Sequence, residues 1–309
     1  MQYGGDGIII IDKPAGATSA KVVARLKKIA GARKTGHTGT LDPFATGVMV
    51  CCFNRATRLA RFFLAGDKTY EAVLYLGQET DTQDSTGETI SICKDVEFSA
   101  GEIRRVFAEF EGSVEQTPPV FSSLKHKGTP LYKLARQGRP VEKPPRQVMI
   151  HYLNISDIRL PEIHFEVSCS SGTYIRTLCA DIGKRLGCGG HLKSLRRIES
   201  CGFSVSRALS LEEVEGLATD GRLPEKIIGM ADAINGMNGY ISDAALKRKI
   251  LSGQKITGRD LKQKPFSERK HGSFKNFIKI TDKENHLLAI LEEKDEAGQY
   301  EYCCVFPKN

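Results

Sequence analysis

The sequence predicts an α+β protein in which a body of strands and helices is followed by a small β-rich module. Short apolar and β-branched runs, such as residues 8–11 and 48–53, are typical of buried strands. Two Ser-x-x-Glu capping boxes begin at Ser99 and Ser210, and each precedes the apolar spacing of a helix. Strand signals return in roughly the last seventy residues, a length within the range of a domain.

The first elements can be placed in order from their patterns. Residues 8–11 predict a strand that is stopped by the Asp-Lys-Pro after it. A helix follows, for which we expect Ser19 as the N-cap and Gly31 as the C-cap. Residues 48–53 predict a second strand and residues 70–76 a third.

The middle of the chain continues with helix and strand signals around one irregular region. The helix after Ser99 is expected to end at Gly112. Residues 117–146 are rich in proline and basic residues, and they predict an inserted loop region rather than a linker between domains. Strands are predicted again at 148–157 and 163–169.

The C-terminal module begins after a Gly-rich stretch of weak periodicity. We expect a short helix, a turn at 251–254, a basic stretch, and strands at 277–280 and 287–291. We therefore divide the chain into domains at residues 1–239 and 240–309.

The composition is that of a basic globular protein. The chain has 309 residues, of which 40% are hydrophobic and 27% charged, and its net charge is +8. Residues 122–147 carry seven Lys or Arg against one acid, and residues 247–279 carry eleven against two. Positive charge clustered in this way favours a phosphate backbone as the partner, although charge alone leaves a membrane surface open.

Several classes of protein are excluded by pattern. The nine cysteines show no metal-ligand spacing, so we expect reduced thiols and no metal. The N-terminus lacks a signal peptide and the apolar runs are too short to cross a bilayer, which predicts a cytoplasmic protein with no membrane partner. The run from Gly31 to Thr38 lacks the lysine that a phosphate-binding P-loop requires.

The most informative stretch is Gly-His-Thr-Gly-Thr-Leu-Asp-Pro-Phe-Ala-Thr-Gly at residues 36–47. Its one carboxylate, Asp42, follows a segment from Lys13 to Leu41 that holds seven Lys or Arg and no acid. Nearby cations favour the charged form of an acid, so the pattern predicts an ionised carboxylate working beside a polyanion. An ordinary turn, in which Asp42 bonds its own backbone and Pro43 sets the bend, is the alternative interpretation.

A second stretch, Ser-Ser-Gly-Thr-Tyr-Ile-Arg at residues 170–176, lies between a predicted strand and a predicted helix. Tyr174 and Arg176 flank Ile175, so they lie off the apolar face of that helix. Alone they are typical of a helix surface. Together with Asp42, Arg176 becomes a natural ion partner that would keep the carboxylate charged and oriented.

Both stretches resemble the pseudouridine synthase family, in particular its bacterial tRNA pseudouridine synthase B type. Further matching segments are Asp12-Lys13-Pro14, Asp67-Lys68-Thr69-Tyr70, the spaced motif from Lys125 to Gly138, and His191–Arg197. The resemblance covers about residues 5–215 with the motifs in order. It implies a mixed, largely antiparallel central sheet flanked by helices, an RNA-gripping insertion at about 117–146, and a C-terminal PUA-type RNA-binding domain.

The resemblance also implies roles for individual residues. Asp42 would be the catalytic aspartate, and Arg176 would pair with it. Tyr70 would stack on the target base and could accept a proton. Tyr174 and Leu195 would line the uridine pocket.

Further residues would hold the RNA or the loop. His37 would enter the space that the flipped nucleotide leaves, and Lys13, with Pro14, would brace the active-site loop. Contacts to the RNA backbone are expected from five basic residues, Lys125, Lys127, Arg136, Arg196 and Arg197.

The activity implied is isomerisation of uridine 55 in the T loop of tRNA to pseudouridine, with the base flipped out of its stack. The N1–C1′ bond breaks and the base rejoins the sugar through C5, so nothing is oxidised and no cofactor is needed. We expect a monomer that acts on the tRNA T arm without a guide RNA. The sequence leaves open whether the aspartate attacks C1′, adds to C6, or acts through a glycal.

Two other functions share much of this pattern. One is the RNA-guided pseudouridine synthase of archaea and eukaryotes. The insertion at 125–138 favours the stand-alone type instead, because this insertion gives the protein its own contacts to RNA. The other is a non-catalytic RNA-binding protein that keeps the fold. An intact set of Asp42, Tyr70 and Arg176 favours an enzyme, since binding alone would not need all three.

Overall fold

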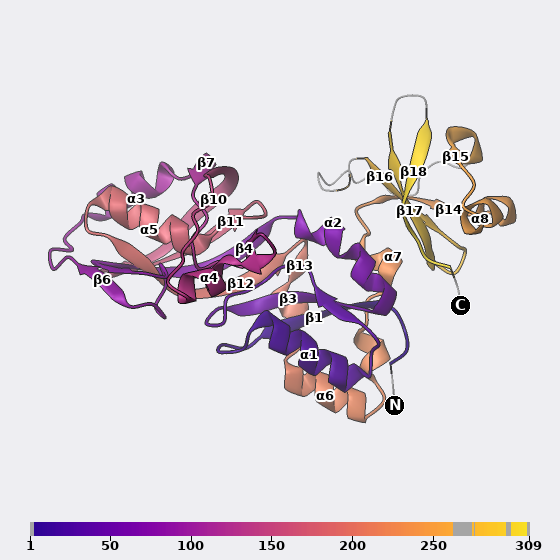
Figure 1. Cartoon of the computed structure of the whole chain (residues 1–309), viewed down its shortest axis with the longest axis horizontal. Coiled ribbons are helices and arrows are strands. Elements are labelled where there is room, and N and C mark those ends of the chain that lie inside the picture. The colour runs from indigo at the N-terminus through magenta and orange to yellow at the C-terminus, as the bar shows by residue number, and fades with distance from the viewer. Residues whose placement is uncertain (1–2, 262–273, 275, 295–297, 308–309) are drawn as a thin grey trace.

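The structure, a computed structural model, describes residues 3–261, 274, 276–294 and 298–307, and it contains two main sheets (Figure 1). The order in the central sheet is β1 (Gly7–Lys13), β3 (Thr46–Phe53), β12 (Gly190–Ser200), β4 (Lys68–Leu76), β11 (Glu162–Cys169), β10 (Arg146–Arg159) and β7 (Gly112–Gln116). Strand β2 (Thr35–His37) extends the sheet beside β3, and β13 (Phe203–Ser204) beside β12. Neighbouring strands are antiparallel except β3 and β12, which confirms the mixed, largely antiparallel sheet.

Strands β1 and β3 are buried on both faces, which explains their unbroken apolar runs. On one face, Ile9 and Met49 pack under α1 (Ser19–Ala30) and α6 (Leu211–Thr219). On the other face, Ile8 and Val50 join a cluster that includes α2 (Ala60–Leu64) and residues of the C-terminal sheet. The strands predicted from these runs are confirmed.

The helix ends follow the capping signals, with two differences. Gly31 ends α1 in the left-handed conformation, as predicted, but the N-cap is Thr18 rather than Ser19, and the Thr18 side chain accepts from the Lys21 N–H. The capping boxes at Ser99 and Ser210 are both formed. Helix α3 (Ala100–Ala108) ends before the predicted Gly112, because residues 109–111 form a turn.

Helices α3 and α5 (Ile175–Leu186) cover the half of the central sheet that lies away from the C-terminal module, where they pack on β4, β10, β11 and β12. The insertion at 117–146 contains the hairpin β8 (Lys125–His126) and β9 (Thr129–Pro130) followed by α4 (Leu131–Arg136). The remaining short elements are β5 (Gln78–Thr80), β6 (Thr89–Ile92), η1 (Asn54–Leu59), η2 (Val205–Arg207), η3 (Leu223–Lys226) and α7 (Met230–Ala233). Within the described ranges, no helix is long and apolar enough to cross a membrane.

The C-terminal sheet has the order β14 (Asn238–Ile241), β16 (Phe277–Thr281), β17 (Leu287–Glu293), β18 (Gln299–Val305) and β15 (Ile256–Thr257). Helix α8 (Ala244–Leu251) and the short η4 (Gly258–Asp260) complete the module. The predicted short helix and the strands at 277–280 and 287–291 are confirmed. Residues 262–273 and 275 of the predicted basic stretch lie outside the described residues.

The C-terminal sheet is joined to the main body by a continuous apolar core. Phe62 of α2 meets Phe277 of β16 edge to face, with ring centroids 5.1 Å apart. The buried ammonium of Lys279 donates to the carbonyls of Ala231 (2.9 Å) and Ile234 (3.1 Å). The division at residues 239 and 240 stays a prediction, and in the structure it falls within β14.

A shared core predicts that damage to the module destabilises the whole chain. Phe306 is 1% exposed and belongs to the cluster that contains Phe62. We expect Phe306→Ala to lower the free energy of unfolding by about 3–5 kcal/mol, with one cooperative transition in denaturant. The control is Leu251→Ala at a side chain 50% exposed, for which a change within about 0.5 kcal/mol is expected. Two separate transitions would contradict a shared core.

Candidate active site

The centre of the site is an ion pair between two segments distant in sequence. Asp42 lies in the loop between β2 and β3, and Arg176 lies in the first turn of α5. The Arg176 Nε atom is 2.9 Å from Asp42 Oδ2, which confirms the predicted pairing. The arginine side chain is 4% exposed and the aspartate side chain 35% exposed. The guanidinium is therefore interior, while the carboxylate still meets the outside.

Arg176 has further partners that the sequence analysis missed. Its Nη1 lies 3.3 Å from the carboxylate of Asp84, which is itself buried, and it donates to the Thr82 carbonyl at 2.8 Å. Its Nη2 donates to the Phe121 carbonyl at 2.9 Å. Asp84 stands in a stretch of Thr, Ser and Asp that reads as an ordinary turn. No local pattern marks it, because the burial of Arg176, which requires more than one compensating partner, is set only in the folded chain.

The loop that carries Asp42 is fixed by side chains from the N-terminal segment. The Ser19 hydroxyl accepts from the Leu41 N–H (3.0 Å) and donates to the Leu41 carbonyl (3.1 Å). The buried ammonium of Lys13 donates to the Pro43 carbonyl at 3.1 Å, as its predicted bracing role requires. Burial lowers the pKa of Lys13 to about 8, and the charge of Asp42 opposes this shift. The residues before and after Asp42 are thus both held through their backbone.

Arg197 holds the loop instead of an RNA phosphate, which corrects its predicted role. It is 2% exposed, and it donates to the carbonyls of Val48 (2.7 Å) and Gly39 (3.1 Å). It is also the register partner of Tyr70 across β12 and β4. Gly47 packs so closely on the Arg197 backbone that an added Cβ would lie 2.2 Å from its carbonyl oxygen. An interior guanidinium cannot reach a polyanion outside.

The other predicted RNA contacts are more accessible. Lys125, Lys127 and Arg136 are exposed on the insertion. Arg196 is partly exposed and makes two hydrogen bonds to the Asp12 carboxylate, at 2.6 and 3.1 Å. Its charge is therefore already compensated in the free protein. These phosphate contacts stay predictions.

The ion pair lines a small pocket of about 100 Å³, and other predicted site residues line the same pocket. Tyr70, Tyr174 and Leu195 line it beside Asp42 and Arg176. Tyr70 and Leu195 are each 8% exposed and offer apolar surface to a planar ring. The predicted constellation from β4, α5, β12 and the loop is thus one site.

His37 lies at the end of β2, where the loop begins. Its Nδ1 accepts the Gly39 N–H at 3.2 Å. Burial lowers the pKa of His37, and the charge of Arg197 lowers it further. The ring is therefore neutral near pH 7, which suits insertion among stacked bases better than pairing with a phosphate.

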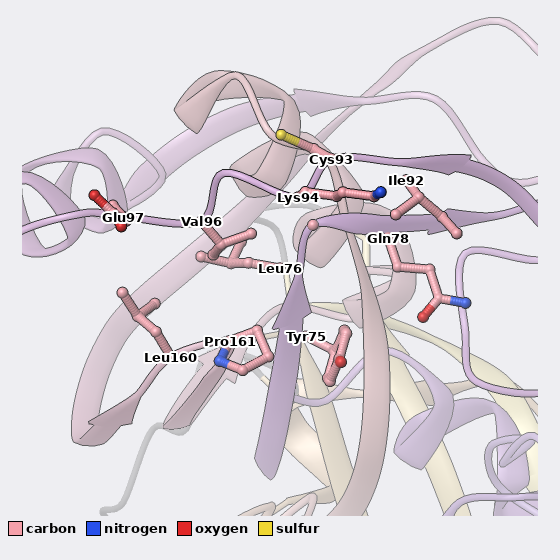
Figure 2. A pocket seen from close by; sticks show the side chains of 11 residues that line it. Tyr75, Leu76, Gln78, Ile92, Cys93, Lys94, Val96, Glu97, Leu160 and Pro161 are labelled. Carbon is pink, nitrogen blue, oxygen red and sulfur yellow. The ribbon is translucent and has the colours of Figure 1, made fainter.

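A larger cavity of about 430 Å³ lies elsewhere, between the end of β4, the ribbon β5–β6 and the turn that joins β10 to β11. Figure 2 shows Tyr75, Leu76, Val96 and Pro161 around it. None of the predicted site residues lines this cavity. Size alone therefore does not locate the chemistry.

The pKa of Asp42 differs from the sequence expectation. Burial raises it above the usual 3.8 and Asp84 adds to the rise, while Arg176 and Lys13 lower it. The sequence suggested that basic neighbours would decide the charge, but desolvation is the larger influence. Burial also raises the pKa of Tyr70 above 10.0, although Arg197 opposes it. Tyr70 is therefore a neutral phenol near pH 7, a state suited to stacking.

The fold and this site define a pseudouridine synthase. Residues 27–175 match the model of the TruB family pseudouridylate synthase (N terminal domain), and residues 176–237 match the tRNA pseudouridylate synthase B C-terminal domain. The chain belongs to the TruB family of tRNA pseudouridine synthases.

Relatives and solved structures agree with this family. The tRNA pseudouridine synthase B of Syntrophotalea carbinolica is 46% identical over 74% of this chain and 74% of that protein. The protein of the same name from Geobacter sulfurreducens is 45% identical over 80% of this chain and 82% of its own length. A chain from a Cbf5–Nop10–Gar1 complex is similar in structure, with a TM-score of 0.75 and 26% identity over 98% of this chain and 85% of that one.

The raised pKa of Asp42 predicts the acid limb of the reaction. The predicted catalytic role of Asp42 requires its ionised carboxylate, so the single-turnover rate should fall as the pH is lowered through a pKa above 3.8. Asp84→Asn removes a charge that raises this pKa, and the acid limb should move to lower pH. The measurement is the rate of pseudouridine formation against pH at saturating protein. An unmoved acid limb in Asp84→Asn would contradict the coupling.

Ser19 and Thr18 form a matched pair for testing the loop contacts. Ser19→Ala removes both bonds to Leu41, so we expect a loss of about 1–3 kcal/mol in stability and a fall of about tenfold or more in single-turnover rate. Thr18→Ala removes the cap of the same helix at about 1 kcal/mol but leaves the loop, so its rate should be unchanged. Equal rate losses in both variants would show that Ser19 acts only through the helix.

Proposed function

We propose that this protein isomerises uridine 55 in the T loop of tRNA to pseudouridine, with Asp42 as the catalytic carboxylate. Membership of the TruB family supports tRNA uridine as the substrate. The single observation that carries the assignment is the Asp42–Arg176 ion pair at the mouth of a pocket lined by Tyr70. It supplies one oriented carboxylate beside a surface on which a base can stack.

The chemistry follows from what the pocket offers. The target base must leave the tRNA stack, which costs about a few kcal/mol, and stacking on Tyr70 returns roughly 1–3 kcal/mol. His37 fills the vacated space. The N1–C1′ bond breaks and a C5–C1′ bond forms, while C5 loses a proton and N1 gains one. Arg176 orients the carboxylate and keeps it available in its charged form.

The remaining affinity comes from phosphate contacts on exposed basic residues. Lys125, Lys127 and Arg136 project from the insertion, where they can hold the backbone of a hairpin. Arg196 can join them if a phosphate competes with Asp12 for its guanidinium. Binding should therefore weaken steeply with salt.

We also propose that the protein acts as a cytoplasmic monomer without a guide RNA, and that its C-terminal sheet is a PUA-type RNA-binding domain. The solved neighbour belongs to a Cbf5–Nop10–Gar1 complex but is only 26% identical. The curated relatives at 45–46% identity are tRNA pseudouridine synthases. The described insertion supports the stand-alone type, because it gives the chain its own basic surface for RNA.

One experiment tests the function directly. Unmodified tRNA transcript is incubated with the protein alone, and pseudouridine is mapped by carbodiimide treatment and primer extension. We expect a stop one nucleotide 3′ of position 55 without any added RNA or protein. A requirement for added RNA would favour the guided type, and binding without any modification would favour a non-catalytic protein.

Asp42→Asn tests the assigned carboxylate. The amide keeps the shape of the side chain, so tRNA binding should stay within about tenfold of the parent protein, whereas pseudouridine formation should be abolished. Filter binding and the primer-extension assay measure the two properties on the same preparation. Turnover retained in this variant would remove Asp42 from its role.

A further inference from the structure

One hydroxyl in the pocket has no role in the mechanism given above. Ser122 is 4% exposed, and its Oγ atom is among the buried side-chain atoms of the described residues that have no hydrogen-bond partner. It lines the same pocket as Asp42 and Tyr70. A buried hydroxyl without a partner is unfavourable, so its presence calls for a group that meets it in another state of the protein.

The backbone around Ser122 is held firmly, which gives the hydroxyl a defined place. The Phe121 carbonyl accepts from Arg176 at 2.9 Å, so this residue pair is tied directly to the catalytic ion pair. The Ser122 carbonyl accepts the Tyr132 N–H at 3.0 Å, which fixes the start of the insertion to α4. A side chain on a backbone fixed in this way can make a contact at a defined position.

Most of the other polar side chains of the pocket are either paired or, like Thr40 and Ser123, exposed to solvent. Asp42 and Arg176 pair with each other. The Thr173 hydroxyl donates to the Ser170 carbonyl at 2.9 Å. Tyr70, Ile175 and Leu195 offer mainly apolar surface to the faces of a ring. Among the residues that line this pocket, Ser122 carries the buried side-chain oxygen without a hydrogen-bond partner, so its hydroxyl is available to the polar edge of a base.

We propose that the Ser122 hydroxyl hydrogen-bonds the edge of the everted uracil that carries C4=O, N3–H and C2=O. This rests on the function proposed above. During the reaction the detached base turns about the axis through N3 and C6, which exchanges C2=O with C4=O and brings C5 to the place of N1. The edge then presents the same order of acceptor, donor and acceptor, so one hydroxyl, which can both donate and accept, retains a partner in both orientations.

Ser122→Ala tests this, with Ser91→Ala as the control, because Ser91 of β6 is an exposed serine that does not line this pocket. Removing an unpartnered buried hydroxyl should leave the unfolding midpoint of Ser122→Ala unchanged or raise it. Its single-turnover rate at saturating protein should fall about tenfold, the size expected for one lost hydrogen bond. Affinity for tRNA, which rests mainly on phosphate contacts, should change little. Ser91→Ala should match the parent protein in all three.

The outcomes separate the proposals. A parent protein that forms no pseudouridine would remove the proposed function itself. An active parent with an equally active Ser122→Ala would overturn the inference whatever the midpoint, and a raised midpoint would show in addition that the hydroxyl is only a packing defect. Rate and midpoint falling together would assign Ser122 a structural role and overturn it as well.

Discussion

The buried guanidinium of Arg176 is the constraint on which the rest of the site depends. An unpaired charge in the interior is very unfavourable, so its compensation must be nearly complete. The partners are the carboxylates of Asp42 and Asp84 and the carbonyls of Thr82 and Phe121. They come from three segments that are distant in sequence. One charge at the start of α5 therefore contacts the catalytic loop, the turn after β5 and the beginning of the insertion at once.

The two acids that contact Arg176 differ in burial and therefore in what they can do. Asp84 is buried, and its Oδ1 accepts from the hydroxyls of Thr82 (2.9 Å) and Thr86 (2.6 Å) and from the Thr86 N–H (2.9 Å). These bonds hold its carboxylate in place beside Arg176. Asp42 keeps 35% of its side chain exposed, so it can be oriented by Arg176 and still reach a sugar. Burial raises the pKa of Asp42, and the charge of Asp84 raises it further. The pH at which Asp42 ionises therefore depends on the second acid as well.

Much of the fold could be predicted from local patterns, because its strands and helices follow simple rules. The runs that became β1 and β3 are apolar on both faces, and the capping boxes at Ser99 and Ser210 satisfy backbone groups within a few residues. Strand β12 was missed because charged residues interrupt its sequence, and only the assembled sheet shows that one of them, Arg197, is interior. The pair of Asp42 and Arg176 was predictable from motifs. The parts played by Asp84, Ser19 and Ser122 were not, because each depends on contacts or burial set by distant segments.

The continuous core between the main body and the C-terminal sheet has a consequence for how RNA is accommodated. Phe62 against Phe277, and Lys279 against the carbonyls that precede β14, leave little freedom for a hinge at this junction. The distance between Asp42 and the C-terminal sheet is then fixed by the fold. A rigid RNA can then contact both Asp42 and this module only if its own dimensions match that separation.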